Sequence, residues 1–369
     1  MSYLWYWPAG GWEFDSWKAR RRAPAVTSEQ AGKRDPLPLV PPGATLRDWQ
    51  EQRERWEHVS REMLGRVTDR PPDRMRWEVL GETYEKRRSP PYTLRRLRYT
   101  LTNKEWGYAW LLTPAGTAAA GRRAAAVIAL HQTVPQGKLE PVGLEGDPEL
   151  AYGRELAEQG FVVLAPDAIA FGERQGGHVN ALYRSADAFF AAHPEGSVMA
   201  KMAYDTSRAV DLLERLPEVD GGRIGCIGHS HGGYGTLFAM LGDERIRAGV
   251  ISCGLTLLRT DPSPDRWWRR TALLPNLGFY EGKVEQSPID FHQWVALVAP
   301  RPLMVSVALK DAIFPRTERV PEALEQAREV YRLHGAADAL HAHAFEGEHR
   351  FPREARTRAY QMLRQSLAG

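Results

Sequence analysis

The stretch DGGRIGCIGHSHGG, residues 220–233, decides the fold of this 369-residue chain. Its first half is a short apolar run typical of a buried strand, and an apolar helical pattern follows it. Between them lies Ser230, with Gly228 two residues before it and Gly232 two residues after it. A turn this tight needs almost no side chain two residues before and after the serine, so the glycines predict a hydroxyl that projects above the sheet at a strand-to-helix turn. Glycines that only let a helix pack closely on a strand are the simpler alternative.

Strands and helices alternate on both sides of this turn. Such alternation predicts an α/β fold with a mostly parallel sheet and helices on both faces, and it places reactive loops at the carboxyl ends of the strands. The predicted strands cover residues 77–84, 93–102, 106–113, 124–130, 161–165, 223–227, 248–252, 303–309 and 340–345. The predicted helices cover 148–160, 197–216, 231–241, 322–333 and 352–367.

The first 75 residues differ from the rest because they are rich in tryptophan and contain a proline-rich connector at 36–42. Apolar residues at helical intervals predict one amphipathic helix over 46–63, ended by Gly65. We therefore divide the chain into an N-terminal extension, 1–75, and a main domain, 76–369. Within the main domain, the irregular aromatic segment 254–298 is a candidate lid or cap.

A nucleophilic serine needs a base, and the base needs an acid that orients it. Asp311 follows the strand predicted at 303–309, and His349 stands between the last predicted strand and the last helix. Ser230, Asp311 and His349 are thus a candidate triad in the order nucleophile, acid, base. Asp311 as a plain turn residue is the alternative, with Glu346 or Glu348 as substitute acids.

The other histidines have simpler readings. His229 and His231 flank the serine, but neighbours at such a turn cannot easily curl back to take its proton. His341 and His343 alternate along one strand and could with His349 imitate a metal cluster. Because no carboxylate or cysteine stands at ligand spacing, we expect no metal site.

Five segments in register resemble the α/β-hydrolases, and more narrowly the dienelactone hydrolase-like and acetyl-xylan-esterase-like serine hydrolases. They are HQTVPQGK (131–138), FVVLAPDAIAFGER (161–174), DGGRIGCIGHSHGG (220–233), APRPLMVSVALKDAIFP (299–315) and GEHRFP (347–352). The resemblance covers residues 75–369. Dienelactone hydrolase itself uses a cysteine nucleophile, and the N-terminal extension lies outside the common fold.

The resemblance implies an oxyanion hole made of two backbone N–H groups, those of Gln132 and His231. Fixed donors aimed at the developing charge lower the barrier by about 3 to 4 kcal/mol each. The side chain of His131, in the same loop, is a candidate substrate contact. Trp267 and Trp268, in the segment 254–298, are candidate pocket residues.

These residues together predict a serine esterase that acts on small or acetyl-type esters without a cofactor. A serine peptidase of the acylaminoacyl type is a second hypothesis, but the 75 N-terminal residues cannot form the propeller that such enzymes carry. A non-catalytic binding protein that uses the aromatic extension is a third.

Composition excludes several partners. The net charge of +3 and scattered basic runs such as Arg95-Arg96-Leu97-Arg98, with no recognition motif, argue against nucleic acid. No segment has the length and apolarity of a membrane span or the form of a secretory signal, so we expect a cytoplasmic protein.

The two cysteines, Cys226 and Cys253, lie in apolar runs and predict reduced core thiols. A homo-oligomer that forms through the N-terminal extension is the one protein partner we expect.

Overall fold

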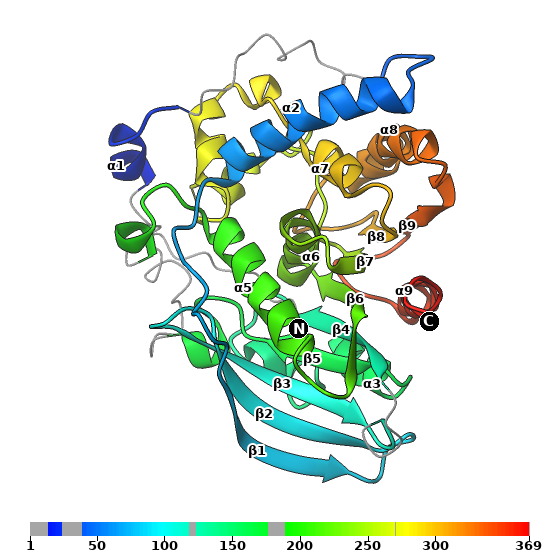
Figure 1. The fold of residues 1–369 in the computed structure, drawn as a ribbon. Coiled ribbons are helices and arrows are strands. Elements are labelled where there is room, and N and C mark those ends of the chain that lie inside the picture. Colours follow the sequence, from blue (N-terminus) through cyan, green and yellow to red (C-terminus); the bar gives the residue numbers. More distant parts are fainter. Residues whose placement is uncertain (1–13, 24–38, 118–122, 176–188, 270, 369) are drawn as a thin grey trace.

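The predicted strands assemble into one nine-stranded sheet in a computed structural model that describes residues 14–23, 39–117, 123–175, 189–269 and 271–368 (Figure 1). The strand order is β1-β2-β3-β5-β4-β6-β7-β8-β9. Pairing is antiparallel from β1 to β3 and between β3 and β5, and parallel among all the others. The strands are β1 (Trp77–Glu85), β2 (Tyr92–Thr100), β3 (Trp106–Pro114), β4 (Ala124–Leu130), β5 (Val162–Pro166), β6 (Val219–His229), β7 (Ile246–Ser252), β8 (Leu303–Ala308) and β9 (Leu340–Phe345).

Helices cover both faces of this sheet, which confirms the predicted α/β-hydrolase architecture. The apolar side chains of α3 and α9 pack on one face, and those of α5, α6, α7 and α8 pack on the other. The α-helices of the described residues are α1 (Phe14–Ala19), α2 (Leu46–Leu64), α3 (Tyr152–Ala157), α5 (Val198–Leu213), α6 (His231–Gly242), α7 (Phe291–Val298), α8 (Val320–Leu333) and α9 (Arg353–Ser366).

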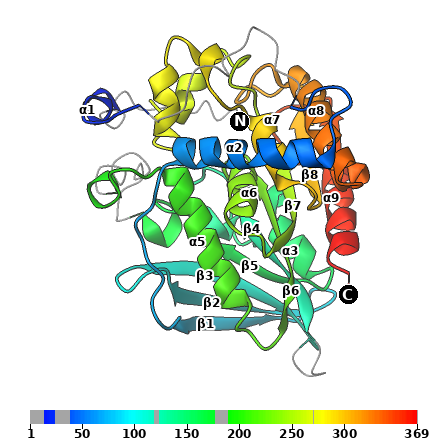
Figure 2. The ribbon, with the colours of Figure 1, turned by 45° about the horizontal axis from the view of Figure 1, so that its top comes forward.

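The N-terminal helix α2 forms as predicted, because its sequence carries signals at both ends. Thr45 and Asp48 form a capping box, and Gly65 ends the helix with a positive φ of 74°. Figure 2 shows α2 lying across α7 and α8. Its Trp49 is fully buried in the main core. The division of the chain at residue 75 stays a prediction.

The helix predicted over 148–160 is wrong as a single element. Asp147 caps only a short 3-10 helix, η3 (Pro148–Leu150), and α3 begins separately at Tyr152. The break is at Ala151, whose ψ of 37° is not helical. Asp147 and Pro148 do form a helix N-terminus as predicted, but the helix that they begin is the short η3 and not a long α-helix.

The segment 254–298 folds mainly as short 3-10 helices followed by α7. The 3-10 helices are η5 (Pro264–Trp267), η6 (Pro275–Tyr280) and η7 (Val284–Gln286). Most of its large aromatic side chains are buried: Trp267, Trp268, Phe291 and Trp294. Trp294 of α7 donates a hydrogen bond from Nε1 to Ser60 Oγ of α2 at 2.9 Å. Whether part of this segment acts as a lid stays a prediction.

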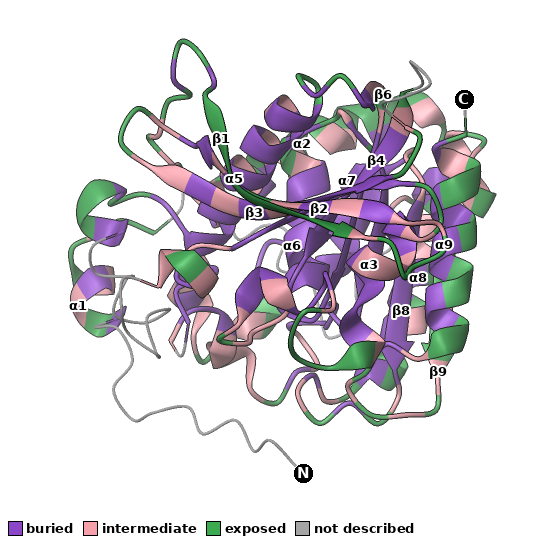
Figure 3. Ribbon diagram, turned by 90° about the horizontal axis from the view of Figure 1, so that it is seen from below, coloured by how far each residue is buried: buried purple, intermediate pink, exposed green. Residues whose placement is uncertain are grey.

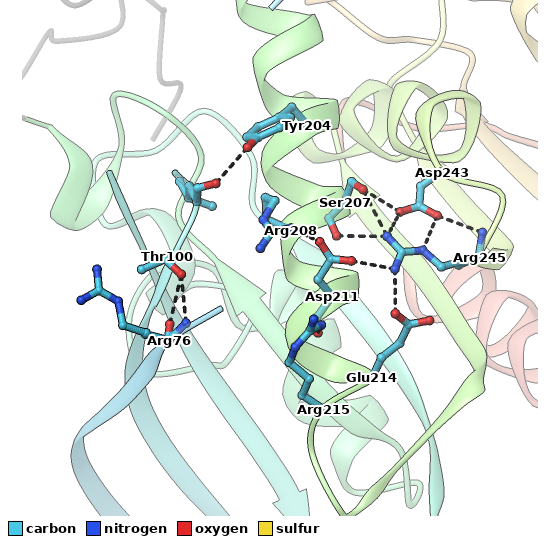
Figure 4. Close-up of polar contacts among 11 residues, drawn as sticks. Arg76, Thr100, Tyr204, Ser207, Arg208, Asp211, Glu214, Arg215, Asp243 and Arg245 are labelled. Carbon is cyan, nitrogen blue, oxygen red and sulfur yellow. Dashed lines mark hydrogen bonds and ion pairs between the residues drawn. The ribbon is translucent and has the colours of Figure 1, made fainter. Parts of the chain in front are cut away.

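A polar cluster joins the end of α5 to the start of β7 (Figure 4). The Arg245 guanidinium forms ion pairs with Asp211 at 2.7 Å, Glu214 at 2.6 Å and Asp243 at 2.6 Å. Ser207 Oγ donates to Asp243 at 2.8 Å. Because α5 and β7 flank α6 in space, this cluster helps to fix the helix that follows Ser230.

Exposure varies strongly across the sheet (Figure 3). The central strands β4 to β8 are mostly buried, whereas β1 is exposed along nearly its whole length at one edge. Within the described ranges, no helix is long and apolar enough to cross a membrane.

Candidate active site

Ser230 occupies the sharp turn between β6 and α6, in a backbone conformation that few non-glycine residues adopt. Its φ is 53° and its ψ is −114°. A Cβ on Gly228 would collide with the carbonyl oxygen of Gly232, and a Cβ on Gly232 would collide with that of Leu130. The backbone N–H of Ser230 donates to the Ser252 carbonyl of β7 at 2.7 Å. The two glycines are therefore needed for close backbone packing, and the strained serine is held between two strands.

Asp311 and His349 meet at the same edge of the sheet. Nδ1 of His349 lies 2.7 Å from Oδ2 of Asp311, and their side chains are only 10% and 1% exposed. The other carboxylate oxygen accepts the N–H groups of Ile313 at 2.8 Å and Phe314 at 2.9 Å. A carboxylate only accepts, so Nδ1 carries the proton and Nε2 is left as the basic nitrogen.

The predicted contact between the serine and the histidine is not formed. Nε2 of His349 has no hydrogen-bond partner among the described residues, so it does not bond to Ser230 Oγ. The His349 ring instead packs against His229 at 4.8 Å and Phe314 at 5.7 Å between ring centroids. Catalytic hydrogen bonds often form only in the substrate complex. The three-residue triad stays a prediction.

The two histidines beside the serine are buried and poorly basic. Burial holds the pKa of His229 well below its usual value, and the neighbouring His349 lowers it further. Burial lowers the pKa of His231 to about 3. Nδ1 of His229 also bonds to Ser252 Oγ at 3.0 Å. Weak bases of this kind are poor proton acceptors at neutral pH, which favours His349 for that role.

His131 fixes the loop that contains Gln132. The N–H of Ala168 donates to Nε2 of His131 at 3.0 Å, so the ring proton stands on Nδ1 and is donated to the Gln132 carbonyl at 2.6 Å. Burial lowers the pKa of this histidine and keeps it neutral. Both ring nitrogens thus bind protein groups. The role of His131 as a substrate contact stays a prediction.

The loop after β4 lies against the first turn of α6, as the proposed oxyanion hole requires. The space beside Gly232 is bounded by the carbonyl groups of Leu130 and His131. The rings of His131 and His231 stack with centroids 5.9 Å apart. The assignment of the Gln132 and His231 amides to the oxyanion is consistent with this packing and stays a prediction.

Trp267 and Trp268 are both core residues, with exposures of 1% and 2%. Trp267 packs on Phe291 with a centroid separation of 4.8 Å and on Phe314, the residue that also contacts His349. Trp268 faces Glu281, 3.5 Å from its Nε1. A substrate contact for either tryptophan stays a prediction.

Asp167 directly follows β5 and bonds to loop backbone. Its carboxylate accepts the N–H of Lys138 at 3.0 Å and that of Glu173 at 2.9 Å, and it pairs with the Lys138 ammonium. Glu173 in turn pairs with Lys138 at 2.7 Å and with Arg96. These ion pairs tie the loops after β4 and β5 together.

Cys253 lies beside Asp311 and His349, where the sequence indicated only a core thiol. It is a free cysteine immediately after β7, with a positive φ of 45°. Burial, and second the charge of Asp311, raise the pKa of its thiol to about 12. Its place directly after a buried parallel strand was the signal that could have found it.

The chain is similar in sequence to one protein family and to two known proteins. The dienelactone hydrolase family matches residues 139–368. Carbohydrate esterase MZ0003, from an unknown prokaryotic organism, is 27% identical over 171 residues, which are 42% of this chain and 38% of that protein. The putative hydrolase YtaP of Bacillus subtilis (strain 168) is 28% identical over 190 residues, 51% of this chain and 59% of that protein. The chain thus spans only part of the length of either relative.

A solved glucuronoyl esterase from Solibacter usitatus has the same fold. It superposes with a TM-score of 0.70 at 18% identity, over 94% of this chain and 100% of that chain. The match of the family covers more than half of the chain. On this evidence the chain belongs to the dienelactone hydrolase family.

Proposed function

We propose that this protein is a serine esterase in which Ser230 is the nucleophile, His349 the general base and Asp311 the acid that orients it. The observation that carries the proposal is the 2.7 Å hydrogen bond between Nδ1 of His349 and Asp311, made at the sheet edge where Ser230 stands. In a neutral imidazole this bond puts the proton on Nδ1, and Nε2, which has no partner in the described chain, is then the basic nitrogen.

In the proposed mechanism, Nε2 of His349 removes the Ser230 hydroxyl proton while Oγ attacks the carbonyl carbon of the ester. A change of the Ser230 or His349 rotamer must first bring Oγ to Nε2. Such general-base assistance contributes about 10² to 10⁴ in rate. Asp311 stabilises the imidazolium that forms, and its two backbone hydrogen bonds keep it in place.

The tetrahedral intermediate carries its negative charge on the former carbonyl oxygen. We assign its stabilisation to the backbone N–H groups of Gln132 and His231, each worth about 10² to 10³ in kcat. Collapse expels the alcohol, which takes the proton from His349. Water then attacks the acyl-enzyme with His349 as base, and the carboxylic acid leaves.

For the substrate, we propose a small ester of a carbohydrate, with acetyl esters as the first class to test. The support is the similarity to a carbohydrate esterase in sequence and to a glucuronoyl esterase in fold. The buried, aromatic surroundings of His349 fit a small acyl group better than a long chain.

The test is hydrolysis of p-nitrophenyl acetate and acetylated sugars by the wild type and by Ser230→Ala, together with labelling by a fluorophosphonate probe. We expect Ser230→Ala to lose both the activity and the label while retaining its circular dichroism spectrum. Ser366→Ala, which removes a hydroxyl at the end of α9, is the matched control and should retain both. Full turnover by Ser230→Ala would refute the nucleophile.

A further inference from the structure

Three side chains of different ligand type converge where β7, β8 and β9 end. Cys253 follows β7, Asp311 lies in the loop after β8, and His349 lies in the loop after β9. The cysteine sulfur, a carboxylate oxygen and an imidazole nitrogen all lie within 4.8 Å of one another. Parallel pairing of these three neighbouring strands brings their carboxyl ends to one edge, so residues far apart in sequence meet there.

The backbone holds Cys253 in this position at a conformational cost. Its φ of 45° lies in the left-handed region, which a non-glycine residue adopts only when its surroundings require it. Its N–H donates to the Ser306 carbonyl at 2.9 Å, and its thiol donates to the Arg350 carbonyl at 3.3 Å. Arg350 directly follows His349, so the sulfur is tied to the same loop as the imidazole.

The charge at this place favours a cation. Within the described ranges, the one ion-pair partner of Asp311 is His349, and no lysine or arginine pairs with its carboxylate. Asp311 is also almost completely buried, which strengthens the attraction of its charge for a cation nearby. Nε2 of His349 has no partner in the same part of the chain, so it is free to carry the ring proton when Nδ1 binds a cation.

We propose that Cys253, Asp311 and His349 form an inhibitory site for a soft divalent cation, of which Zn²⁺ is the best fit. Sulfur and imidazole ligands select Zn²⁺ over Mg²⁺ and Ca²⁺, which prefer sets of oxygen ligands. Bonds of about 2.0 to 2.3 Å put the ligand atoms of a tetrahedral zinc about 3.3 to 3.6 Å apart. Side-chain shifts of about 1 Å would open the 2.7 Å contact between Nδ1 and Oδ2 and bring ligand atoms that lie up to 4.8 Å apart to this spacing, and water completes the fourth position.

Metal binding removes the base by redistributing protons. The thiol releases its proton to solvent and binds as thiolate, and Nδ1 of His349 exchanges its proton for the metal. A neutral imidazole that is metallated at Nδ1 carries its proton on Nε2. Nε2 then cannot accept the proton of Ser230, so hydrolysis stops. This consequence rests on the proposed function, whereas the binding of the metal does not.

The experiment uses two probes on the full chain. Cd²⁺ reports thiolate ligation through its ultraviolet charge-transfer band, and Zn²⁺ reports inhibition of p-nitrophenyl acetate hydrolysis, scaled to the metal-free rate of each variant. Cys253→Ala and Cys253→Ser remove the ligand, and the second keeps the side-chain size if the first fails to fold. Cys226→Ala is the matched control, because Cys226 is the other free, buried cysteine and lies within β6.

We expect the cadmium band in the wild type and in Cys226→Ala, and its loss in both Cys253 variants. Zinc should inhibit the wild type reversibly, with EDTA restoring activity, and the Cys253 variants should need at least about 10-fold more zinc. Mg²⁺ and Ca²⁺ at equal concentration should not inhibit.

A band that persists without Cys253, or that disappears in Cys226→Ala, would overturn the site. A band that depends on Cys253 but comes without zinc inhibition would overturn its inhibitory role. If the wild type hydrolyses no ester, the proposed function fails, and the cadmium band still decides whether the metal site exists.

Discussion

The imidazole Nδ1 of His349 and the carboxylate Oδ2 of Asp311 lie 2.7 Å apart, joining the loops that follow two neighbouring parallel strands. The same carboxylate accepts two backbone N–H groups through Oδ1, from Ile313 and Phe314. The loop thus fixes the carboxylate, and the carboxylate fixes the tautomer of the histidine. A substitution that changes which hydrogen bonds residue 311 can accept should therefore lower the catalytic rate by changing the tautomer of His349.

Asp311→Asn should lower kcat by about 10⁴ with little change in KM, because an amide in this place no longer holds the Nδ1–H tautomer. The asparagine oxygen can still accept the N–H groups of Ile313 and Phe314, so the loop should remain folded. Steady-state hydrolysis of p-nitrophenyl acetate measures the effect. Asp338→Asn, an exposed aspartate just before β9, is the control. A loss of less than tenfold at Asp311 would exclude it as the orienting acid.

His131 should act through the Gln132 peptide, as a positioning residue of the oxyanion hole. His131→Phe removes both hydrogen bonds of the ring and should lower kcat by about 10² to 10³ while KM changes little, since the donor is misplaced mainly for the transition state. His131→Asn keeps a donor near the Nδ1 position toward the Gln132 carbonyl and should retain more kcat than His131→Gln, which keeps only an acceptor near Nε2. Equal kcat values for Asn and Gln would contradict this role.

Much of the fold follows from local patterns. Buried parallel strands such as β4 read as continuous apolar runs, and the β4 bounds predicted from the sequence agree with the structure at both ends. Helix α2 was predictable because its cap, periodicity and terminal glycine agree with one another. The break at Ala151 was not predictable, because no helix-breaking residue marks it, and the Arg154 N–H that follows it donates to the Pro141 carbonyl of a distant loop at 3.0 Å.

The candidate site residues that directly follow a predicted strand could be predicted from the sequence. Rotamers and buried ion pairs, which depend on side-chain packing, could not. Asp311 and His349 each follow a strand, and they meet as expected. The sequence does not determine side-chain rotamers, so it could not predict that His349 Nε2 makes no hydrogen bond to Ser230. Lys201 was also unforeseen: it looks like a surface lysine of α5, but it is buried between Glu105 at 2.6 Å and Asp205 at 2.8 Å. Only the fold brings those charges together.

His292 should make the protein sensitive to acid, independently of catalysis. It is fully buried at the start of α7, and neither of its ring nitrogens has a hydrogen-bond partner in the described chain. Burial, with a smaller effect of Arg259, lowers its pKa to about 3 from an ordinary value of 6.5. Between these values the unfolded chain binds a proton at this residue and the folded chain does not, so the free energy of unfolding falls as pH falls.

His292→Leu should remove this loss while filling the space with an apolar side chain. Compared with the variant, the wild type should lose up to about 1.4 kcal/mol more stability for each pH unit below about 6. Urea unfolding at a series of pH values between about 7 and about 4 measures the two slopes. His58→Leu, at an exposed position on α2, is the matched control, and its slope should equal that of the wild type. Because every other histidine is common to both proteins, the difference in slope isolates His292. Parallel curves for His292→Leu and the wild type would show that His292 is protonated in the folded chain, which the absence of a partner for either ring nitrogen argues against.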